Sequence, residues 1–340
     1  MINRMYFIIS KKIVMSHIGL TALLILLVSI VAITISSCTK DEKVLYLGMM
    51  VHIEGWDEEV NNEAMFIRHA DVVRKLATIF EKHGAKATFE ARSEFVTGCK
   101  NWDDNVLLEL YNRGHGVGVH ADVGGGKGVL TQRGFAVEIA EMKEDVEELT
   151  NIDILHVSGI CSELDWVKAA IDAGYKFASG TIGYCAMSLP EDKRPEEYKD
   201  CPNPGKCHGV IPVEIKDRIR PWKTINGQNW LEHDPDGKLV ILTESGVIEN
   251  LAEYAKGESS IGGEFTQADI DVYIKMVEEA LDYAEPGEVN FLYVALSIGS
   301  PKINEVLYKE WLTAIEPYVN SGKVEWKTLP EIYTAYVYNE

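Results

Sequence analysis

The most informative stretch of this sequence is Arg113-Gly-His-Gly-Val-Gly-Val-His-Ala-Asp122. It has the pattern of a short strand that is entered through a glycine turn and ends at a histidine. When parallel strands form a sheet, the side chains at their C-terminal ends meet at one edge, where such folds place their chemistry. Asp122 follows His120 by two residues, so both side chains can face the same way. We therefore take both as candidates for catalysis or metal binding.

The same pattern occurs once more, at His52-Ile-Glu54. These residues end an apolar run that starts at residue 44, and a continuous apolar run is typical of a buried parallel strand. Two pairs of a histidine and a carboxylate at two strand ends are able to hold a metal ion. They can equally be what remains of a site that has lost its activity, and the residues alone leave both interpretations open.

Strand-like and helix-like patterns alternate from residue 44 to residue 340. The predicted strands span residues 44–54, 86–91, 117–120, 154–157, 176–178, 210–215, 239–242, 289–296 and 324–326. Helices with apolar residues at helical spacing are predicted at 61–83, 103–112, 131–150, 266–283 and 303–318. A further helix is predicted from Ser162, with Asp165 completing a capping box. This order predicts an α/β fold in which a parallel sheet, closed or nearly closed into a barrel, is covered by helices in one domain.

The N-terminus has the plan of an export signal. Three cations precede an apolar run at residues 18–35, and the run leads into Ile35-Ser-Ser-Cys38, which resembles a bacterial lipobox. That resemblance implies that residues 1–37 are removed, that Cys38 carries a lipid, and that residues 38–43 form a tether. An uncleaved anchor is the alternative, because the apolar run is just long enough to span a bilayer. Either way we expect a membrane-anchored domain on the periplasmic or cell-surface side.

The formal charge of the chain is −20. A strongly acidic surface repels phosphate backbones, so nucleic acid is excluded as the expected partner. The charge favours solubility and neutral or cationic ligands.

Five cysteines follow Cys38, and an exported chain can oxidise them. Three lie in an insert rich in Cys, Pro and Gly at about residues 183–209. Within it, Cys201 and Cys207 are a candidate disulfide. A zinc site made by these two residues with Cys185 and His208 is the alternative, although the spacing matches no C-x-x-C pair. Because five is odd, at least one thiol is expected to stay free or to pair elsewhere.

Three segments resemble the polysaccharide deacetylases of the NodB-like, carbohydrate esterase 4 type. Phe80-Glu-Lys-His-Gly-Ala-Lys-Ala-Thr-Phe89 resembles a helix-Gly-strand passage of that family, and residues 113–120 resemble its R-G-H-E-x-G-x-H segment. Val167-Lys-Ala-Ala-Ile-Asp-Ala-Gly-Tyr175 resembles the helix and turn after its third motif. The resemblance implies a deformed (β/α)7 barrel and a metal-dependent hydrolase that removes acyl groups, from amide or ester linkages, of carbohydrate such as a cell-envelope glycan.

The chain departs from the family's first two motifs. In T-F-D-D-G, the position of the base falls on Ile53 and that of the metal-binding Asp falls on Glu54. In H-[ST]-x-x-H, His120 matches the first ligand, but the second ligand position is Gly124. One metal ligand is thus kept in kind and one is replaced by a residue of like charge.

Two further catalytic residues of the family have no counterpart. The Arg-Pro pair of the third motif should fall near residues 157–161, and neither residue is there. The late strand should end at a histidine, but residues 294–298 contain none. A catalytically inactive relative that binds glycan is therefore the second interpretation.

The residues that remain still supply a candidate site. We expect His52, Glu54 and His120 to bind a divalent metal, since these ligand types suit zinc and three protein ligands are usual in a catalytic site. Asp122 or Glu90 would be the fourth ligand or the base that takes a proton from water. Glu90 lies in an otherwise apolar strand, and a buried carboxylate is costly without a partner, so we expect it to have one.

Loop aromatics bear on the glycan-binding alternative. Rings at a barrel mouth can stack on sugars, but they can equally form apolar lids. The candidates are Trp56, Trp102, Tyr184, Trp222 and Trp230. A third interpretation, a scaffold lipoprotein without a small ligand, predicts a plugged barrel mouth.

Overall fold

The computed structural model describes residues 43–56, 58–125, 131–257, 263–298 and 303–339. Val44–Glu340 form one compact unit. The predicted signal segment, Cys38 and all but the last residue of the tether lie outside the described residues. Within the described part, no helix has both the length and the apolar character needed to span a bilayer.

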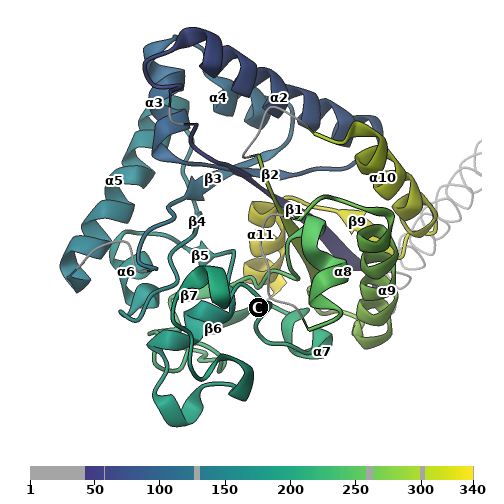
Figure 1. Cartoon of the computed structure of the whole chain (residues 1–340). Coiled ribbons are helices and arrows are strands. Elements are labelled where there is room, and N and C mark those ends of the chain that lie inside the picture. Colours follow the sequence, from purple (N-terminus) through teal and green to yellow (C-terminus); the bar gives the residue numbers. More distant parts are fainter. Residues whose placement is uncertain (1–42, 57, 126–130, 258–262, 299–302, 340) are drawn as a thin grey trace, which may run out of the picture. The chain divides into compact units, whose positions relative to one another are not determined.

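A single curled sheet organises this unit (Figure 1). Its strands run in the order β6-β7-β5-β4-β3-β2-β1-β8, with β9 also paired to β1. All neighbours are parallel except β6 and β7. The strands are β1 (Leu45–Ile53), β2 (Thr88–Ala91), β3 (Gly116–His120), β4 (His156–Ser158), β5 (Phe177–Ala178), β6 (Trp222–Thr224), β7 (Leu239–Ile241), β8 (Asn290–Ser297) and β9 (Val324–Trp326).

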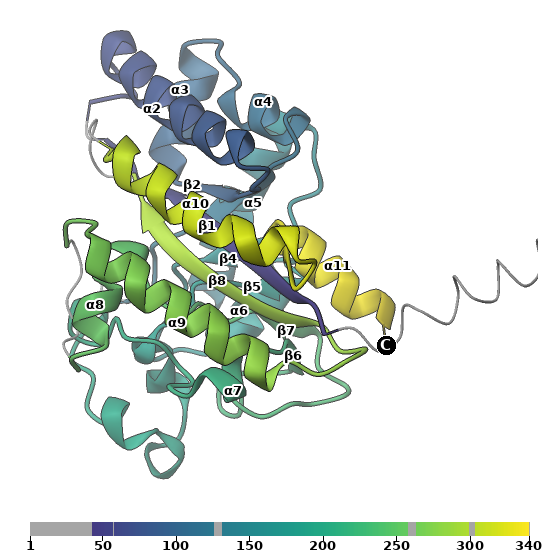
Figure 2. The same ribbon diagram turned by 90° about the vertical axis from the view of Figure 1, so that its right-hand side faces the viewer.

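Helices cover the outside of the curl, and α9 and α10 lie side by side next to β8 (Figures 1 and 2). The described helices are α2 (Glu63–Lys82), α3 (Ser93–Asn101), α4 (Val106–Asn112), α5 (Gln132–Thr150), α6 (Trp166–Asp172), α7 (Ile215–Arg218), α8 (Leu251–Tyr254), α9 (Gln267–Tyr283), α10 (Glu305–Asn320) and α11 (Leu329–Asn339). The 3-10 turns η1 (Gly183–Ser188), η2 (Glu191–Lys193), η3 (Glu196–Tyr198) and η4 (Pro204–Lys206) lie in the insert, and η5 (Ile248–Asn250) precedes α8.

The segment after β7 brings the curl toward closure. The Ser245 amide donates to the Tyr293 carbonyl at 2.8 Å, and the Ala295 amide donates to the Gly246 carbonyl at 3.0 Å. Val247 also bridges Ala295 in parallel. Seven of the parallel strands, β1–β5, β7 and β8, thus make a half-barrel, in agreement with the predicted deformed (β/α)7 barrel.

The inside of the curl has an apolar end and a polar end. Alternation along β1 puts Gly48, Met50 and His52 on the inner face. At the N-terminal ends of the strands, α11 inserts Leu329 and Ile332 into an apolar cluster that includes Met50, Phe177, Phe291 and Tyr293. At the C-terminal ends the inward-facing residues are polar, so this end is the one equipped for chemistry.

Two predicted element boundaries are wrong. The strand predicted at residues 210–215 reduces to one bridge, Ile182 with Val210, because Pro212 has no N–H to continue a ladder. The strand that joins the sheet near this point is β6 instead. The helix predicted from Ser162 begins later: Asp165 is the N-cap of α6, and its carboxylate accepts the Lys168 amide at 2.9 Å.

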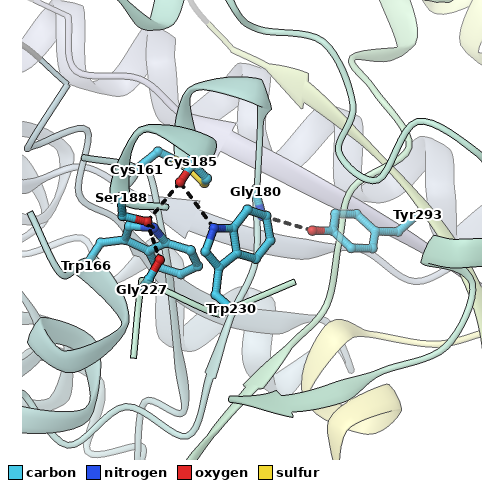
Figure 3. The surroundings of a disulfide bond; sticks show 8 residues. All are labelled: Cys161, Trp166, Gly180, Cys185, Ser188, Gly227, Trp230 and Tyr293. Carbon is cyan, nitrogen blue, oxygen red and sulfur yellow. Dashed lines mark hydrogen bonds between the residues drawn. A yellow bond between two sulfur atoms is a disulfide. The ribbon is translucent and has the colours of Figure 1, made fainter. Parts of the chain in front are cut away.

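Two disulfides tie the insert together. One joins Cys161, after β4, to Cys185 in η1, beside the rings of Trp166 and Trp230 (Figure 3). The other joins Cys201 to Cys207. The cysteines of the alternative zinc site are therefore all in disulfides, and Cys99 is a buried free thiol.

Candidate metal centre

Three side chains from two strand ends meet at the polar end of the half-barrel. His52 lies near the end of β1, Glu54 follows that strand, and His120 ends β3. One ligand atom from each lies within 4.8 Å of the others. The two imidazole rings stack with their centroids 3.8 Å apart, and Nε2 of His120 lies 3.6 Å from Oε1 of Glu54. The structure thus brings together the three residues that the sequence predicts as metal ligands.

A relay of polar contacts sets the form of His120. Its Nδ1 lies 2.9 Å from the Ser158 hydroxyl, and that hydroxyl donates its hydrogen to the Glu90 carboxylate. The Ser158 oxygen must therefore accept a hydrogen from Nδ1 of His120. Neutral imidazole carries one N–H, so Nε2 keeps the lone pair that a metal needs.

Glu90 is the buried anchor of this relay. The Ser179 hydroxyl donates to it at 2.8 Å, and the ring nitrogens of His156 and His52 lie 2.9 Å and 3.6 Å from its oxygens. Burial works against the charged carboxylate, but His156, His52 and the Ser158 hydroxyl together hold the pKa of Glu90 below its ordinary value. The partner that a carboxylate in this apolar strand requires is thus a set of histidines and serines.

A glycine in β3 lets one of these partners reach Glu90. Gly118 lies opposite Glu90 in the strand register. A Cβ atom at Gly118 would sit 2.2 Å from Nε2 of His156, so any side chain there would occupy the space of the ring. The glycine-rich stretch at residues 113–122 therefore leaves room for the His156 ring to lie across β3.

Asp122 is held by Arg92, which is not among the site residues predicted from the sequence. Nη1 of Arg92 lies 2.8 Å from Oδ2 of Asp122 and 3.9 Å from Oε2 of Glu54, and Nε lies 3.3 Å from Glu94. Arg92 follows β2 directly, at the same edge of the sheet, and that position is the signal that could have found it. One cation thus links Asp122 to the histidine cluster.

The candidate ligands line a cavity of about 1060 Å³. His52, Glu54, His120 and Asp122 all contribute to its wall, whereas Glu90 does not. The cavity is large enough for a small ligand. The plugged mouth that a scaffold protein predicts is absent among the described residues.

The loop after β7 supplies two unusual acids to the same wall, Glu244 and Glu249. Burial raises the pKa of Glu244 to about 8, with a contribution from the negative charge of Glu90. Burial also raises the pKa of Glu249 to about 7, although the Tyr308 hydroxyl donates to it at 2.9 Å and opposes the shift. Neither acid is among the site residues predicted from the sequence.

His208, to which the sequence argument gave no role, also lines the cavity, and burial lowers its pKa to about 4. The aromatic residues proposed as a sugar platform do not line it. Trp56 stacks on His69, and the indole N–H of Trp102 donates to the Glu59 carbonyl at 2.9 Å. Tyr184, Trp222 and Trp230 are buried in the core.

The donor set fits a divalent metal. Two imidazoles and one carboxylate are the ligands that zinc and similar ions take in catalytic sites. His120 has the required tautomer, and Nε2 of His52 is buried without a hydrogen-bond partner among the described residues. Nη1 of Arg92 lies 3.9 Å from Oε2 of Glu54, farther than from Asp122. His52, Glu54 and His120 could therefore hold a metal.

No family model matches the sequence, and no curated protein matches it. Solved structures do match. A protein assigned as a polysaccharide deacetylase from Mycobacterium smegmatis gives a TM-score of 0.55 at 12% identity, covering 86% of this chain and 90% of that one. PuuE allantoinase gives 0.55 at 12% identity, with 86% and 90% covered. A protein assigned as a polysaccharide deacetylase from Pseudomonas aeruginosa PAO1 gives 0.53 at 12% identity, with 86% and 91% covered.

This chain has the fold of the polysaccharide deacetylases. The resemblance noted in the sequence and the predicted fold class are confirmed at the level of architecture. At such low identity, the likeness to solved deacetylase structures describes the fold and leaves the activity open.

The departures from the deacetylase motifs have visible structural consequences. Ile53, at the expected position of the base, packs in the core instead of lining the cavity. In the region of the missing Arg-Pro pair, Ser158 contacts both His120 and Glu90. The late strand β8 ends at Ser297, whose hydroxyl donates to Glu54 at 3.3 Å. A polar network thus surrounds the cluster, built from residues other than those of the deacetylase motifs.

Proposed function

We propose that this protein is a metal-dependent hydrolase that removes acyl groups from carbohydrate, cleaving an amide or an ester. The observation that carries the proposal is the convergence of His52, Glu54 and His120 in the wall of a cavity, with the lone pair of His120 Nε2 turned outward by Ser158. Zinc is the proposed metal, because the ligands are borderline to hard. The deacetylase fold supports the reaction class.

The chain's own residues divide the remaining tasks. When bound, a divalent metal would polarise the acyl oxygen and activate water. Asp122 lines the cavity and is partly exposed, so it is the proposed base for that water, held in place by Arg92. Glu90 is fully buried and outside the cavity wall, which supports a positioning role through Ser158 and His52.

Removal of the Glu54 carboxylate tests the proposal. We expect the wild-type protein to bind zinc by calorimetry and to release acetate from acetylated oligosaccharides, and Glu54→Ala to lose both properties. Glu94→Ala is the matched control, because Glu94 contacts the same Arg92 but lies outside the cluster. The substrate panel includes allantoin, since one similar structure is an allantoinase. Full turnover in Glu54→Ala, or no zinc binding by the wild type, would refute the proposal.

The alternative is a glycan-binding protein without activity. It is favoured by Ile53 at the expected position of the base and by the absence of histidine in residues 294–298. Glycan binding by the wild type without acyl release from any substrate, in the presence of zinc, would decide for this alternative.

We also propose that the chain is exported and lipid-anchored. The support is the charged, apolar and small-residue pattern that ends at Cys38. Labelled fatty acid should be incorporated in cells and lost in Cys38→Ala. Unchanged labelling in that variant would contradict the proposed anchor.

A further inference from the structure

Glu244 is a buried acid in the cavity wall. It is 1% exposed, and its Oε1 is buried without a hydrogen-bond partner among the described residues. No cation within those residues forms an ion pair with it. A buried carboxylate without a partner is strongly disfavoured, so natural proteins retain such a group where it has a use.

The chain topology places Glu244 on the other flank of His52 from His120. Along the sheet, β3 with His120 lies beyond β2 on one side of β1. On the other side of β1 lies β8, and residues 245–247 pair with β8 beyond it. Glu244 directly precedes that pairing and lines the same cavity as His52 and His120. A ligand that fills the cavity therefore lies between the two flanks.

The segment around Glu244 is held by hydrogen bonds of residues 242, 243 and 245, and none of these bonds involves the Glu244 carboxyl. The Thr243 hydroxyl donates to the Arg218 carbonyl at 3.0 Å, and Nε of Arg218 donates to the Ser245 hydroxyl at 3.3 Å. Tyr293 donates to the Leu242 carbonyl at 2.7 Å and accepts the Gly180 amide, a contact drawn in Figure 3. Rigid support without a partner is the arrangement expected of a group that acts on a ligand.

We propose that Glu244 is the proton donor to the leaving group in the hydrolysis proposed above. In that reaction, the oxygen of water bonds to the acyl carbon while Asp122 takes the proton that water loses. The bond from the acyl carbon to nitrogen or oxygen breaks, and the Glu244 carboxyl gives its proton to that departing atom. The products are a carboxylic acid and an amine or alcohol, and proton exchange with solvent resets both carboxyls.

The protonation state of Glu244 suits this role. Burial raises its pKa to about 8, so the carboxyl is protonated at neutral pH and can act as an acid. Glu249, the other acid of the loop, already accepts the Tyr308 hydroxyl. Glu249 is therefore the matched control, with a similar environment and a partner that Glu244 lacks.

Leaving-group dependence tests the role without relying on pH. An N-acetylated sugar loses a basic amine that must be protonated, whereas 4-nitrophenyl acetate loses a stable anion that needs no proton. With zinc bound, we expect Glu244→Gln to lower turnover of the acetamide by roughly 100- to 10,000-fold and that of the aryl ester only slightly. Glu249→Gln changes another acid of the cavity wall and should affect the two substrates to the same extent. Equal losses on both substrates, or no loss on the acetamide, would overturn the assignment.

A second readout needs neither metal nor turnover. In metal-free protein between pH 7 and 8, the infrared band of a protonated carboxyl should be present in the wild type and in Glu249→Gln. The band should be weaker in Glu244→Gln than in Glu249→Gln, because Glu249, with a pKa of about 7, is less protonated in this range than Glu244, with a pKa of about 8. A band as strong in Glu244→Gln as in the wild type would overturn the proposal.

The inference rests on the proposed function, and the two can fail separately. Wild-type protein that binds zinc but hydrolyses neither substrate refutes the function and the inference together. If the wild type is active and Glu244→Gln is equally active on the acetamide, the inference is refuted and the proposed function stands.

Discussion

At the scale of single residues, the contacts behind the candidate ligands matter as much as the ligands. Ser158 both accepts from Nδ1 of His120 and donates to Glu90, so one hydroxyl fixes a tautomer and satisfies a buried charge. Partners of this kind orient metal-binding histidines and raise their basicity. The relay explains why Glu90 can be buried and still serve the site.

Ser158→Ala tests the relay. Loss of the hydroxyl frees the His120 ring to rotate or to change tautomer, so zinc affinity should fall about 10- to 100-fold. Ser179→Ala is the control, because Ser179 also donates to Glu90, at 2.8 Å, whereas Ser158 is the serine that contacts Nδ1 of His120. Competition with a chromophoric chelator measures both variants. Equal affinity losses in the two would show that the charge of Glu90, rather than the orientation of His120, governs binding.

Glu244 should leave a signature in stability as well as in activity. Its folded-state pKa of about 8 lies above the ordinary value of 4.5, so its stabilising contribution is present below pH 4.5 and is lost as pH rises through 8. At about 1.4 kcal/mol per pKa unit, the loss by pH 8 is about 4 kcal/mol. Glu244→Gln should therefore be more stable than the wild type by up to that amount at pH 8, and by little at pH 4. Urea denaturation at both pH values measures this, and an equal difference at both would contradict it.

At the scale of elements, alternation along the strands decides what enters the half-barrel. β3 presents Gly116, Gly118 and His120 to the inside, and its glycines make room for side chains from neighbouring strands. A Cβ at Gly116 would lie 2.8 Å from the Thr88 hydroxyl, and one at Gly118 would meet the His156 ring. The glycines of β3 thus leave space for the buried polar side chains of neighbouring strands.

Gly118→Ala tests whether the His156 ring needs the space that this glycine leaves. The added methyl group overlaps the His156 ring and pushes it away from Glu90, which should cost about 1–3 kcal/mol of unfolding free energy. In a His156→Ala background, the same change should cost much less, because the overlap has been removed. Urea denaturation of the four proteins completes the cycle. Strict additivity would show that the two positions do not compete for space.

The sequence could predict the elements that follow a simple period, and the ligands at their ends. Apolar runs predict β1 and β8. The C-terminal ends of parallel strands meet at one edge of the sheet, and this places His52, Glu54 and His120 together. Arg92 was missed although its position directly after β2 was a signal for it. Glu244 could not be identified, because a charged residue in a loop has the same appearance in the sequence whether it is solvated or buried. The burial of Glu244 depends on the pairing of residues 245–247 with β8, a contact distant in sequence.

Short irregular elements were unpredictable for the same reason. β6 is three residues long and joins the sheet as an antiparallel edge, without a periodic pattern of its own. The apolar run at residues 210–215 has the composition of a strand, but Pro212 and the packing of the insert override that preference. Local composition therefore located the core strands and failed where tertiary contacts decide.

At the scale of the whole unit Val44–Glu340, stability and chemistry are placed at opposite ends of the half-barrel. The C-terminal ends of the strands hold the acids and histidines, which are expensive to bury. The N-terminal ends are closed by α11, the last helix of the chain, whose Leu329 and Ile332 are fully buried. This separation lets the site carry groups such as Glu90 and Glu244, because apolar packing elsewhere supplies the offsetting stability.

Truncation in α11 tests this division. Leu329→Ala removes a fully buried side chain that packs near Gly48 and clusters with Tyr293, so unfolding free energy should fall by about 2–5 kcal/mol. Zinc affinity of the folded protein should stay unchanged, because the cavity wall does not include this residue. Tyr338→Ala in the same helix is the control: Tyr338 is 85% exposed, and its loss should change stability by no more than about 0.5 kcal/mol. If Leu329→Ala weakens zinc binding while the protein remains folded, the two ends are coupled and the proposed division of stability from chemistry is wrong.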